Sequence, residues 1–231
     1  MGYIPLMSLY PIFLSLENVH VLVAGAGKVG RRKIAGLLEA RAGMVLVFDP
    51  GLSSEAQAEL ETSPAVRIFC RAVTTADLDD VRLVFAATGD AVENLRIAAL
   101  CSKRGILVNV VDNPTISDFY VPAVARSSDL TAAFSTGGNS PALAARIRED
   151  AENWLEEAYG PLLIFMRRLR PLVLAENKSA DENGEVFRSI VRSDIGEAMA
   201  TGQWQRARDI AAAFLPRSLH EHIEELFHGL G

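Results

Sequence analysis

The first part of the chain alternates between short apolar runs and longer stretches whose apolar residues recur at helical spacing. Short β-branched runs that end in Gly, Asp or Thr are typical of buried strands, which this pattern predicts at residues 19–24, 44–48, 66–70, 83–87 and 106–111. Helical spacing between them predicts helices at 28–39, 53–60 and 94–103, the second capped by Ser53 or Ser54. Strands and helices alternating at this spacing predict an α/β fold with a doubly wound parallel sheet over residues 1–113.

The pattern changes after Asp112. A turn at 113–115 is followed by apolar runs at 119–124 and 130–134, which we expect to pair as antiparallel strands. Ser140 as N-cap and Pro141 at the first helical position predict a helix over 141–159, with Gly160-Pro161 as its stop. Only helical patterns follow, broken by a loop at 181–184 and including amphipathic pieces within 207–226. We therefore expect a small linking element at 114–150 and a helical C-terminal domain at 151–231.

A glycine motif lies where the first strand meets the first helix. Gly25-Ala26-Gly27-Lys28-Val29-Gly30 is a complete G-x-G-x-x-G. In that position Gly25 allows the tight turn, Gly27 lets backbone amides approach a pyrophosphate, and Gly30 permits close helix–strand packing. Asp49 ends the next strand, where its carboxylate can accept from ribose hydroxyls and disfavours a 2′-phosphate. The motif predicts a Rossmann-like domain that binds NAD rather than NADP.

Two further turns follow the fourth and fifth strands. Thr88-Gly89-Asp90 and Val110-Val111-Asp112 end strands of the same parallel sheet, so we expect both turns to face one crevice at its carboxyl edge. Asp112 is therefore a candidate acid or base near the cofactor. The alternative is that Asp112 only starts an Asx turn into Asn113-Pro114, and these residues alone leave both interpretations open.

A second group of backbone amides precedes the long helix. The loop Gly137-Gly138-Asn139-Ser140-Pro141 suits a carboxylate or phosphate, and Arg146 and Arg148 in the same helix could support an anion there. Simple capping of the helix explains the loop as well. A solvated helix face explains the arginines equally well, because Glu149, Asp150 and Glu152 balance their charge.

Composition narrows the class of protein. The 231 residues carry 23 Lys and Arg against 29 Asp and Glu, a net charge of −6, which argues against nucleic acid as the main partner but allows a local basic pocket. Cys70 and Cys101 lie in apolar runs and are expected to be small buried hydrophobes in a reducing compartment. The four histidines show no metal-binding pattern, so we expect no permanent metal site. The apolar stretch at 3–16 is short and contains two prolines, so we expect no membrane partner and a cytoplasmic protein.

Six motifs in order resemble one family. They are Pro11-Ile12-Phe13-Leu14, the run from Val23 to Lys33, Ala86-Ala87-Thr88-Gly89-Asp90, Asn109-Val110-Val111-Asp112, Phe119-Tyr120-Val121-Pro122-Ala123, and the run from Ser135 to Ala144. Over residues 10–170 the chain resembles the precorrin-2 dehydrogenase/sirohydrochlorin ferrochelatase family, the amino-terminal module of siroheme synthase. The resemblance implies NAD-dependent oxidation of precorrin-2 to sirohydrochlorin, followed in many members by insertion of Fe(II), which is then a substrate.

The resemblance also implies roles for individual residues. Asp112 matches the aspartate that the family uses in dehydrogenation and, where present, in chelation. The implied NAD-binding residues are Gly25, Gly27, Lys28, Val29, Gly30, Asp49, Pro50, Thr88 and Val110. Candidate anchors for the tetrapyrrole carboxylates are Arg126, Thr136, Gly137, Gly138, Arg146 and Arg148. Thr136 stands where some members carry a serine that can be phosphorylated.

Partners follow from the same resemblance. The family forms homodimers through the region after Asp112, which makes 114–150 a dimerisation element. The fused methyltransferase module of longer members is not expected in 231 residues, so the resemblance implies a separate methyltransferase upstream. Three alternatives remain open: a dehydrogenase without chelatase activity, a non-catalytic nucleotide-sensing domain, and an inert tetrapyrrole carrier.

Overall fold

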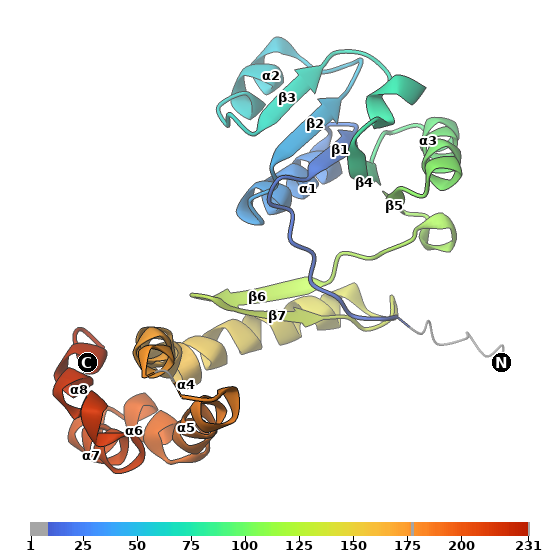
Figure 1. The fold of residues 1–231 in the computed structure, drawn as a ribbon. Coiled ribbons are helices and arrows are strands. Elements are labelled where there is room, and N and C mark those ends of the chain that lie inside the picture. Colours follow the sequence, from blue (N-terminus) through green and yellow to red (C-terminus); the bar gives the residue numbers. More distant parts are fainter. Residues whose placement is uncertain (1–8, 177, 231) are drawn as a thin grey trace. The chain divides into compact units, whose positions relative to one another are not determined.

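The computed structural model describes residues 9–176 and 178–230. These residues form two compact units, Leu9–Val121 and 122–230, and each is described by itself (Figure 1). The first unit is an α/β domain and the second consists of a β-hairpin and helices.

The first unit is built on a sheet of five parallel strands in the order β3-β2-β1-β4-β5 (Figure 1). The strands are β1 (His20–Ala24), β2 (Met44–Phe48), β3 (Val66–Phe69), β4 (Val81–Ala86) and β5 (Leu107–Val110). The helices are α1 (Lys28–Glu39), α2 (Ser54–Leu60) and α3 (Ala91–Arg104). The sequence-based prediction of a doubly wound α/β fold is confirmed, because the chain order changes direction between β1 and β4.

Both faces of the sheet are covered. Val21 and Val23 pack with Ile34 of α1 on one face, and Leu22 packs with Ile97 of α3 on the other. A strand that is buried on both faces needs apolar residues at successive positions, which explains the continuous run in β1.

β5 lies at the edge of the sheet, and the chain that follows it covers its outer side. The amide of Val108 donates to Asp118 Oδ2 at 2.9 Å, and the amide of Asp118 donates to the Val108 carbonyl at 2.8 Å. Asn109 Nδ2 also donates to the Phe119 carbonyl at 2.9 Å. The predicted strand at 119–124 is therefore wrong in its start, since residues 118 and 119 are bonded to β5 and the next strand begins only at Ala123.

The second unit begins with an antiparallel pair, as predicted. β6 (Ala123–Ser127) pairs with β7 (Leu130–Phe134) in a register that sets Ala123 opposite Phe134. The pair packs on the long helix α4 (Pro141–Ala175), and the buried Ser127 hydroxyl is hydrogen bonded to Glu156 of that helix. The hairpin and α4 therefore pack against each other as two layers.

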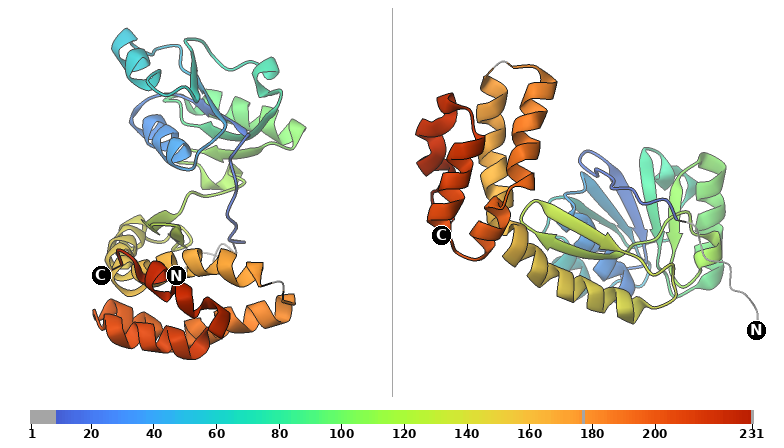
Figure 2. Two further views of the ribbon diagram at one scale, coloured as in Figure 1. Left: turned by 60° about the vertical axis from the view of Figure 1, so that its left-hand side comes forward. Right: turned by 90° about the horizontal axis from the view of Figure 1, so that it is seen from below.

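Helix α4 continues past its predicted stop. Its start is as predicted, with Ser140 Oγ accepting from the Leu143 amide at 3.2 Å, but the helix runs for 35 residues through Pro161. An internal proline costs a helix about 3 kcal/mol, whereas each fully buried Leu or Phe contributes about 1.5–3 kcal/mol. Phe165 and Leu169, just beyond the proline, are completely buried, so packing outweighs the local stop signal. The helix bends where its yellow and orange parts meet, as expected of an internal proline (Figure 2).

Four more helices complete the second unit around the later part of α4. They are α5 (Ala180–Arg192), α6 (Ile195–Ala200), α7 (Trp204–Phe214) and α8 (Ile223–Phe227), with a 3₁₀ turn at Arg217–His222. The predicted loop at 181–184 is wrong, because Ser179 and Glu182 form a capping box that starts α5. The S-x-x-E spacing was a readable signal for this helix start.

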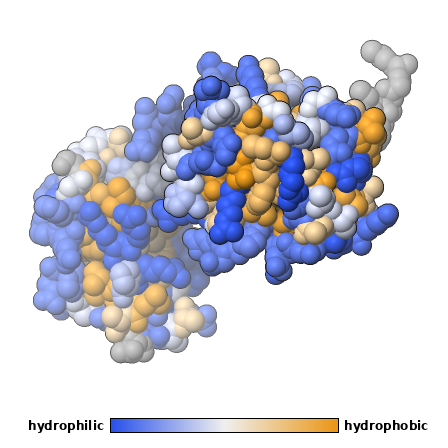
Figure 3. Space-filling model, turned by 90° about the horizontal axis from the view of Figure 1, so that it is seen from above, coloured by the Kyte–Doolittle hydropathy of each residue, from blue (hydrophilic) through white to orange (hydrophobic). Residues whose placement is uncertain are grey.

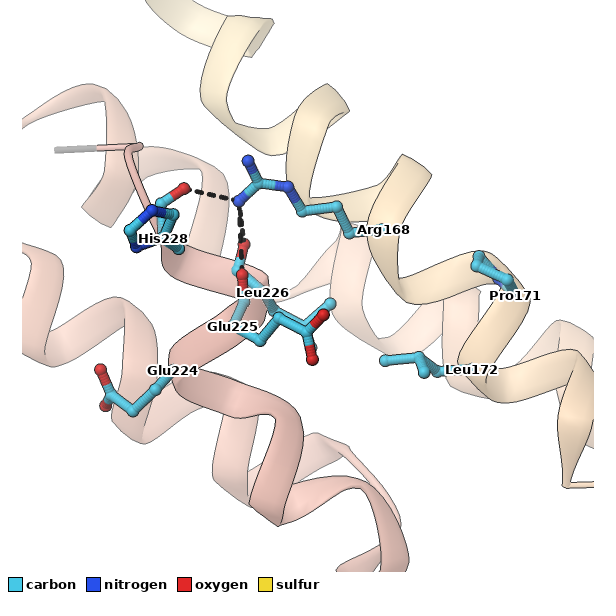
Figure 4. A pocket seen from close by; sticks show the side chains of 7 residues that line it. All are labelled: Arg168, Pro171, Leu172, Glu224, Glu225, Leu226 and His228. Atoms are coloured by element: carbon cyan, nitrogen blue, oxygen red, sulfur yellow. Dashed lines mark hydrogen bonds between the residues drawn. The ribbon is translucent and has the colours of Figure 1, made fainter.

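A cavity of about 750 Å³ lies between α4 and α8. Arg168 points from α4 to the carbonyls at the end of α8, and its Nη1 donates to Leu226 at 3.1 Å and to His228 at 2.7 Å (Figure 4). A cation that satisfies the last carbonyls of a helix stabilises that helix end. Arg168 is therefore a structural link between the two helices.

The two cysteines differ in their surroundings. Cys101 lies on the buried face of α3, and burial raises the pKa of its thiol to about 11. Cys70 is exposed, so the expectation that both are buried is wrong: β3 ends at Phe69 and leaves Cys70 in the following loop.

Polar and apolar side chains are interspersed over the face of the molecule shown in Figure 3. Within residues 9–176 and 178–230, no helix combines the length and the apolar character needed to cross a membrane.

Candidate functional site

The glycine loop between β1 and α1 requires two of its glycines. Gly25 has a φ of +90°, and a Cβ there would lie 2.4 Å from the Ala87 carbonyl oxygen. A Cβ on Gly30 would lie 1.9 Å from the Gly25 carbonyl oxygen, so helix and loop touch directly. A Cβ on Gly27 would have no neighbour within 4 Å, and no side chain caps α1 there. The first-turn amides of α1 therefore face open space, where they can hold a phosphate.

Asp49 braces this loop. Its Oδ2 accepts from the Ala26 amide at 2.8 Å, and its Oδ1 accepts from the Gly51 amide at 2.9 Å. Each carboxylate oxygen retains a further lone pair, so the half-buried Asp49 can still accept from a ribose hydroxyl. The acid at the end of β2 thus has a structural role that its position in the sequence did not reveal.

Asn94 holds the turn after β4 through hydrogen bonds to Thr88, and the sequence alone did not lead us to predict this role. Its Oδ1 accepts from Thr88 Oγ1 at 2.6 Å and from the Thr88 amide at 3.1 Å, while its Nδ2 donates to the Thr88 carbonyl at 3.2 Å. The signal was present, because Asn94 occupies a buried helical position in register with Ile97 and Cys101. A polar residue at such a position requires hydrogen-bonding partners.

These elements surround a cavity of about 610 Å³, here called the glycine-loop cavity. Five predicted cofactor residues line it: Gly25, Gly27, Asp49, Pro50 and Thr88. All of its ionisable lining residues are acidic, namely Asp49, Asp90 and Glu93. Glu93 is paired with Arg96 at 2.7 Å, and the hydrogen bonds from Arg96 lower the pKa of its carboxyl. The negative charge of these lining carboxylates would repel an additional phosphate on the ribose of a dinucleotide bound in the cavity.

A second, smaller cavity of about 230 Å³ lies between α1 and the end of β5, and it is here called the α1–β5 cavity. Val29, Val110 and Asp112 line it, whereas Lys28 is exposed outside both cavities and Gly30 is buried. The turns after β4 and β5 thus line two hollows and not the single crevice expected. The two are neighbours, since the Val111 amide donates to the Ala86 carbonyl at 3.0 Å.

Asp112 lies in a tight turn. The Asn113 amide donates to the Val110 carbonyl at 3.2 Å, and Asp112 adopts a left-handed φ of +59°. Such a conformation costs a residue with a side chain about 1–3 kcal/mol. The carboxylate is exposed, and within the described chain it has no hydrogen-bond partner, so the Asx turn considered as an alternative is not formed. The geometry leaves this carboxylate available to accept a proton.

The remaining candidates lie in the second unit. Thr136 Oγ1 accepts from the Ser140 amide at 3.0 Å, and Gly137 and Gly138 both have positive φ. Arg146 pairs with Asp150 and Arg148 with Glu152, as on a solvated helix face. Arg126 is exposed on β6.

No group of three His, Cys, Asp or Glu side chains with the arrangement of a metal site occurs in the part of the chain that the structure describes.

Comparison with known proteins gives three kinds of match. A family described as putative NAD(P)-binding matches residues 12–123. Siroheme synthases of Thioalkalivibrio sulfidiphilus and Nitrosospira multiformis are each 34% identical to this chain, over 88% and 96% of its length. The chain covers 41% and 47% of those proteins, so it spans less than half of each. The solved structure of SirC, a precorrin-2 dehydrogenase, matches with a TM-score of 0.69 and 28% identity, over 87% of this chain and all of that one.

Proposed function

The chain belongs to the family of the precorrin-2 dehydrogenases and siroheme synthase amino-terminal modules, and from that premise we propose that it oxidises precorrin-2 to sirohydrochlorin with NAD⁺. The observation that carries the proposal is the unpartnered Asp112 carboxylate beside a dinucleotide-type glycine loop. The two lie at the carboxyl edge of one parallel sheet, where ligands of such folds bind.

The glycine-loop cavity fits NAD⁺. The open space at Gly27 admits a pyrophosphate to the first-turn amides of α1, and Asp49 accepts from the adenosine ribose. Thr88, held by Asn94, fixes the wall of the cavity beside β4. The acidic lining favours NAD⁺ over NADP⁺ because a 2′-phosphate would meet carboxylates.

The reaction removes two hydrogens from the macrocycle, one as a hydride and one as a proton. Bound NAD⁺ supplies the acceptor for the hydride, which makes NADH. Asp112 takes the proton as general base, since its carboxylate lies at the cavity surface without an internal hydrogen bond. The products are sirohydrochlorin, NADH and a proton released from Asp112 to solvent.

The test uses the purified chain with precorrin-2 and NAD⁺. We expect NADH and the sirohydrochlorin absorption spectrum to form together. No NADH under conditions in which a known precorrin-2 dehydrogenase turns over would overturn the proposal. NAD⁺ binding without turnover would instead favour the non-catalytic nucleotide-sensing alternative.

A second proposed activity at the same carboxylate is the insertion of Fe(II) into sirohydrochlorin. Two pyrrole protons leave as the substrate iron enters, and Asp112 accepts them one after the other and passes each to solvent, since no hydrogen bond within the described chain engages its carboxylate. Fe(II) and sirohydrochlorin with enzyme, compared with a blank, test this step. A rate equal to the blank would leave the dehydrogenase alone.

The second unit supports a homodimer. Leu143, Ile147 and Trp154 share one face of α4 and are 52%, 37% and 55% exposed. An apolar stripe of this kind on a surface helix is typical of an interface. We expect sedimentation to give a dimer and Ile147→Glu to dissociate it. A monomeric wild type would contradict the assignment.

A further inference from the structure

Two adjacent cations line the α1–β5 cavity across from Asp112. Arg32 and Lys33 lie in the second turn of α1, and the opposite wall comes from residues 109–114 and from Tyr120. Arg32 is exposed and Lys33 is half-buried. The cavity therefore combines two positive side chains with one carboxylate, whereas the ionisable residues that line the glycine-loop cavity are all acidic.

Neither cation has an acidic partner in the described chain. The preceding residue, Arg31, pairs with Glu59 at 2.7 Å, whereas no carboxylate lies within ion-pair distance of Arg32 or Lys33. A half-buried charge such as that of Lys33 is ordinarily paired, because removing it from water is costly, and the exposed Arg32 beside it adds a second positive charge. Two neighbouring cations that line one cavity without an acidic partner indicate that their counter-charge arrives with a ligand.

Lys33 is held in place. Its Nζ lies 5.6 Å from the centroid of the Phe85 ring, which in turn meets Phe119 edge-on at 5.3 Å. Burial, and then the charge of Arg32, lower the pKa of the Lys33 ammonium, so the folded protein bears a cost for keeping it charged. A bound anion would offset that cost.

The opposite wall is fixed as well. Tyr120 Oη donates to the Pro114 carbonyl at 2.8 Å, and the Val110 amide donates to Ser117 Oγ at 2.9 Å. Asp112 is thereby held on a braced loop that lines the same cavity as α1. The fold thus brings the backbone of Asp112 and that of the two cations to one cavity.

We propose that Arg32 and Lys33 form the binding site for a carboxylate side chain of the tetrapyrrole and so hold the edge of the macrocycle against Asp112. The inference rests on the proposed function. A cavity of about 230 Å³ is below the usual range for a whole ligand, so it suits one carboxylate arm. Arg32 offers a two-pronged donor to the carboxylate, and Lys33 adds a point charge.

The experiment compares the double variant Arg32→Gln/Lys33→Gln with the charge-matched control Arg82→Gln/Lys103→Gln, whose side chains are exposed in the same unit. Loss of each charge-assisted hydrogen bond is expected to raise the KM for precorrin-2 about tenfold. The Kd for sirohydrochlorin, measured by quenching of tetrapyrrole fluorescence, should rise in parallel. The Kd for NAD⁺ should not change, and Lys33→Arg should recover most of the affinity that Lys33→Gln loses.

The possible outcomes distinguish failure of the carboxylate site from failure of the proposed function. A double variant with wild-type KM and wild-type sirohydrochlorin affinity would overturn the carboxylate site while leaving the proposed function intact. A raised Kd for NAD⁺ would overturn it too, because the cations would then serve the cofactor. Wild type that neither oxidises precorrin-2 nor binds sirohydrochlorin would overturn the proposed function itself. Added salt should raise the KM of wild type more than that of the double variant.

Discussion

The two cavities at the carboxyl edge of the sheet differ in the charge of their lining residues and in the protein groups that they offer to a ligand. The ionisable side chains that line the glycine-loop cavity are all acidic, so we propose that backbone amides at the start of α1 hold the phosphate there. The α1–β5 cavity is lined by Arg32 and Lys33, whose side chains hold the carboxylate in our proposal. Under these two proposals one helix serves two kinds of anion, through its amides at the first turn and its side chains at the second. Substitutions that affect one cavity and spare the other test this division.

The largest effect is expected from Gly25→Val. The left-handed φ and a Cβ only 2.4 Å from the Ala87 carbonyl oxygen leave no room for a side chain, so we expect NAD⁺ binding to be lost and thermal stability to fall. Gly36→Ala in α1, the helix that follows the loop, is the control, because a Cβ there meets nothing within 4 Å and alanine should stabilise the helix by about 0.5–1 kcal/mol. Calorimetry for NAD⁺ and thermal unfolding measure both. Retained NAD⁺ affinity in Gly25→Val would contradict the placement of the loop.

Asp112→Asn removes the proton acceptor with little change of shape. Asparagine tolerates the left-handed conformation, so the fold and the Kd for NAD⁺ should be preserved. We expect kcat for precorrin-2 oxidation to fall about 10²–10⁴-fold, the range for loss of a general base. Steady-state kinetics with NADH detection check this. Turnover at the wild-type rate would remove Asp112 from its proposed role.

Asp49→Ser should have a moderate effect confined to the glycine-loop cavity. The charged acceptor for the ribose and the charge that repels a 2′-phosphate are removed together, so the preference for NAD⁺ over NADP⁺ should fall by about tenfold, the equivalent of one hydrogen bond. Titration with both dinucleotides measures the ratio. The KM for precorrin-2 at saturating NAD⁺ should stay near the wild-type value, and a rise there would show that the two cavities are not independent.

The smallest expected effect is on the loss of folding stability at low pH, and it concerns Asp77. Hydrogen bonds from the Arg71 guanidinium hold the pKa of Asp77 well below its usual range, and Arg71 lies 5.0 Å from the centroid of Phe48, which lines the glycine-loop cavity. A depressed pKa stabilises the fold above the pKa of the unfolded carboxyl, about 3.9, and this contribution is lost as pH falls below it. Unfolding by urea at pH 7 and pH 3 should show a smaller acid-induced loss in Asp77→Asn than in wild type. Equal losses in the two proteins would contradict this.

Local patterns predicted the first unit well. The bounds expected for α1 and β2 agree with Lys28–Glu39 and Met44–Phe48. Both elements are bounded by residues close to them in the sequence, such as the glycine loop before α1 and Asp49-Pro50 after β2. The same local logic failed at Pro161 in α4. There the deciding contacts come from α5 to α8, far along the sequence, and no nearby residue reports them.

The candidate site shows the same division. The grouping of the glycine loop and Asp49 around one cavity was predictable, because the loop is a run of consecutive residues and Asp49 directly follows the next strand. The hydrogen bonds of Asn94 to Thr88 and the meeting of Lys33 with Asp112 in one cavity were not, since each depends on how separate elements pack.

The left-handed turn at Asp112 also limits which acidic residue its backbone accepts. Glutamate tolerates such a backbone less well than aspartate and would carry its carboxylate one methylene further from the turn. Asparagine and glycine suit the backbone but bring no acid. The backbone conformation, more than the acidity of the side chain, therefore favours aspartate at position 112, and few other residues combine an acidic group with this backbone.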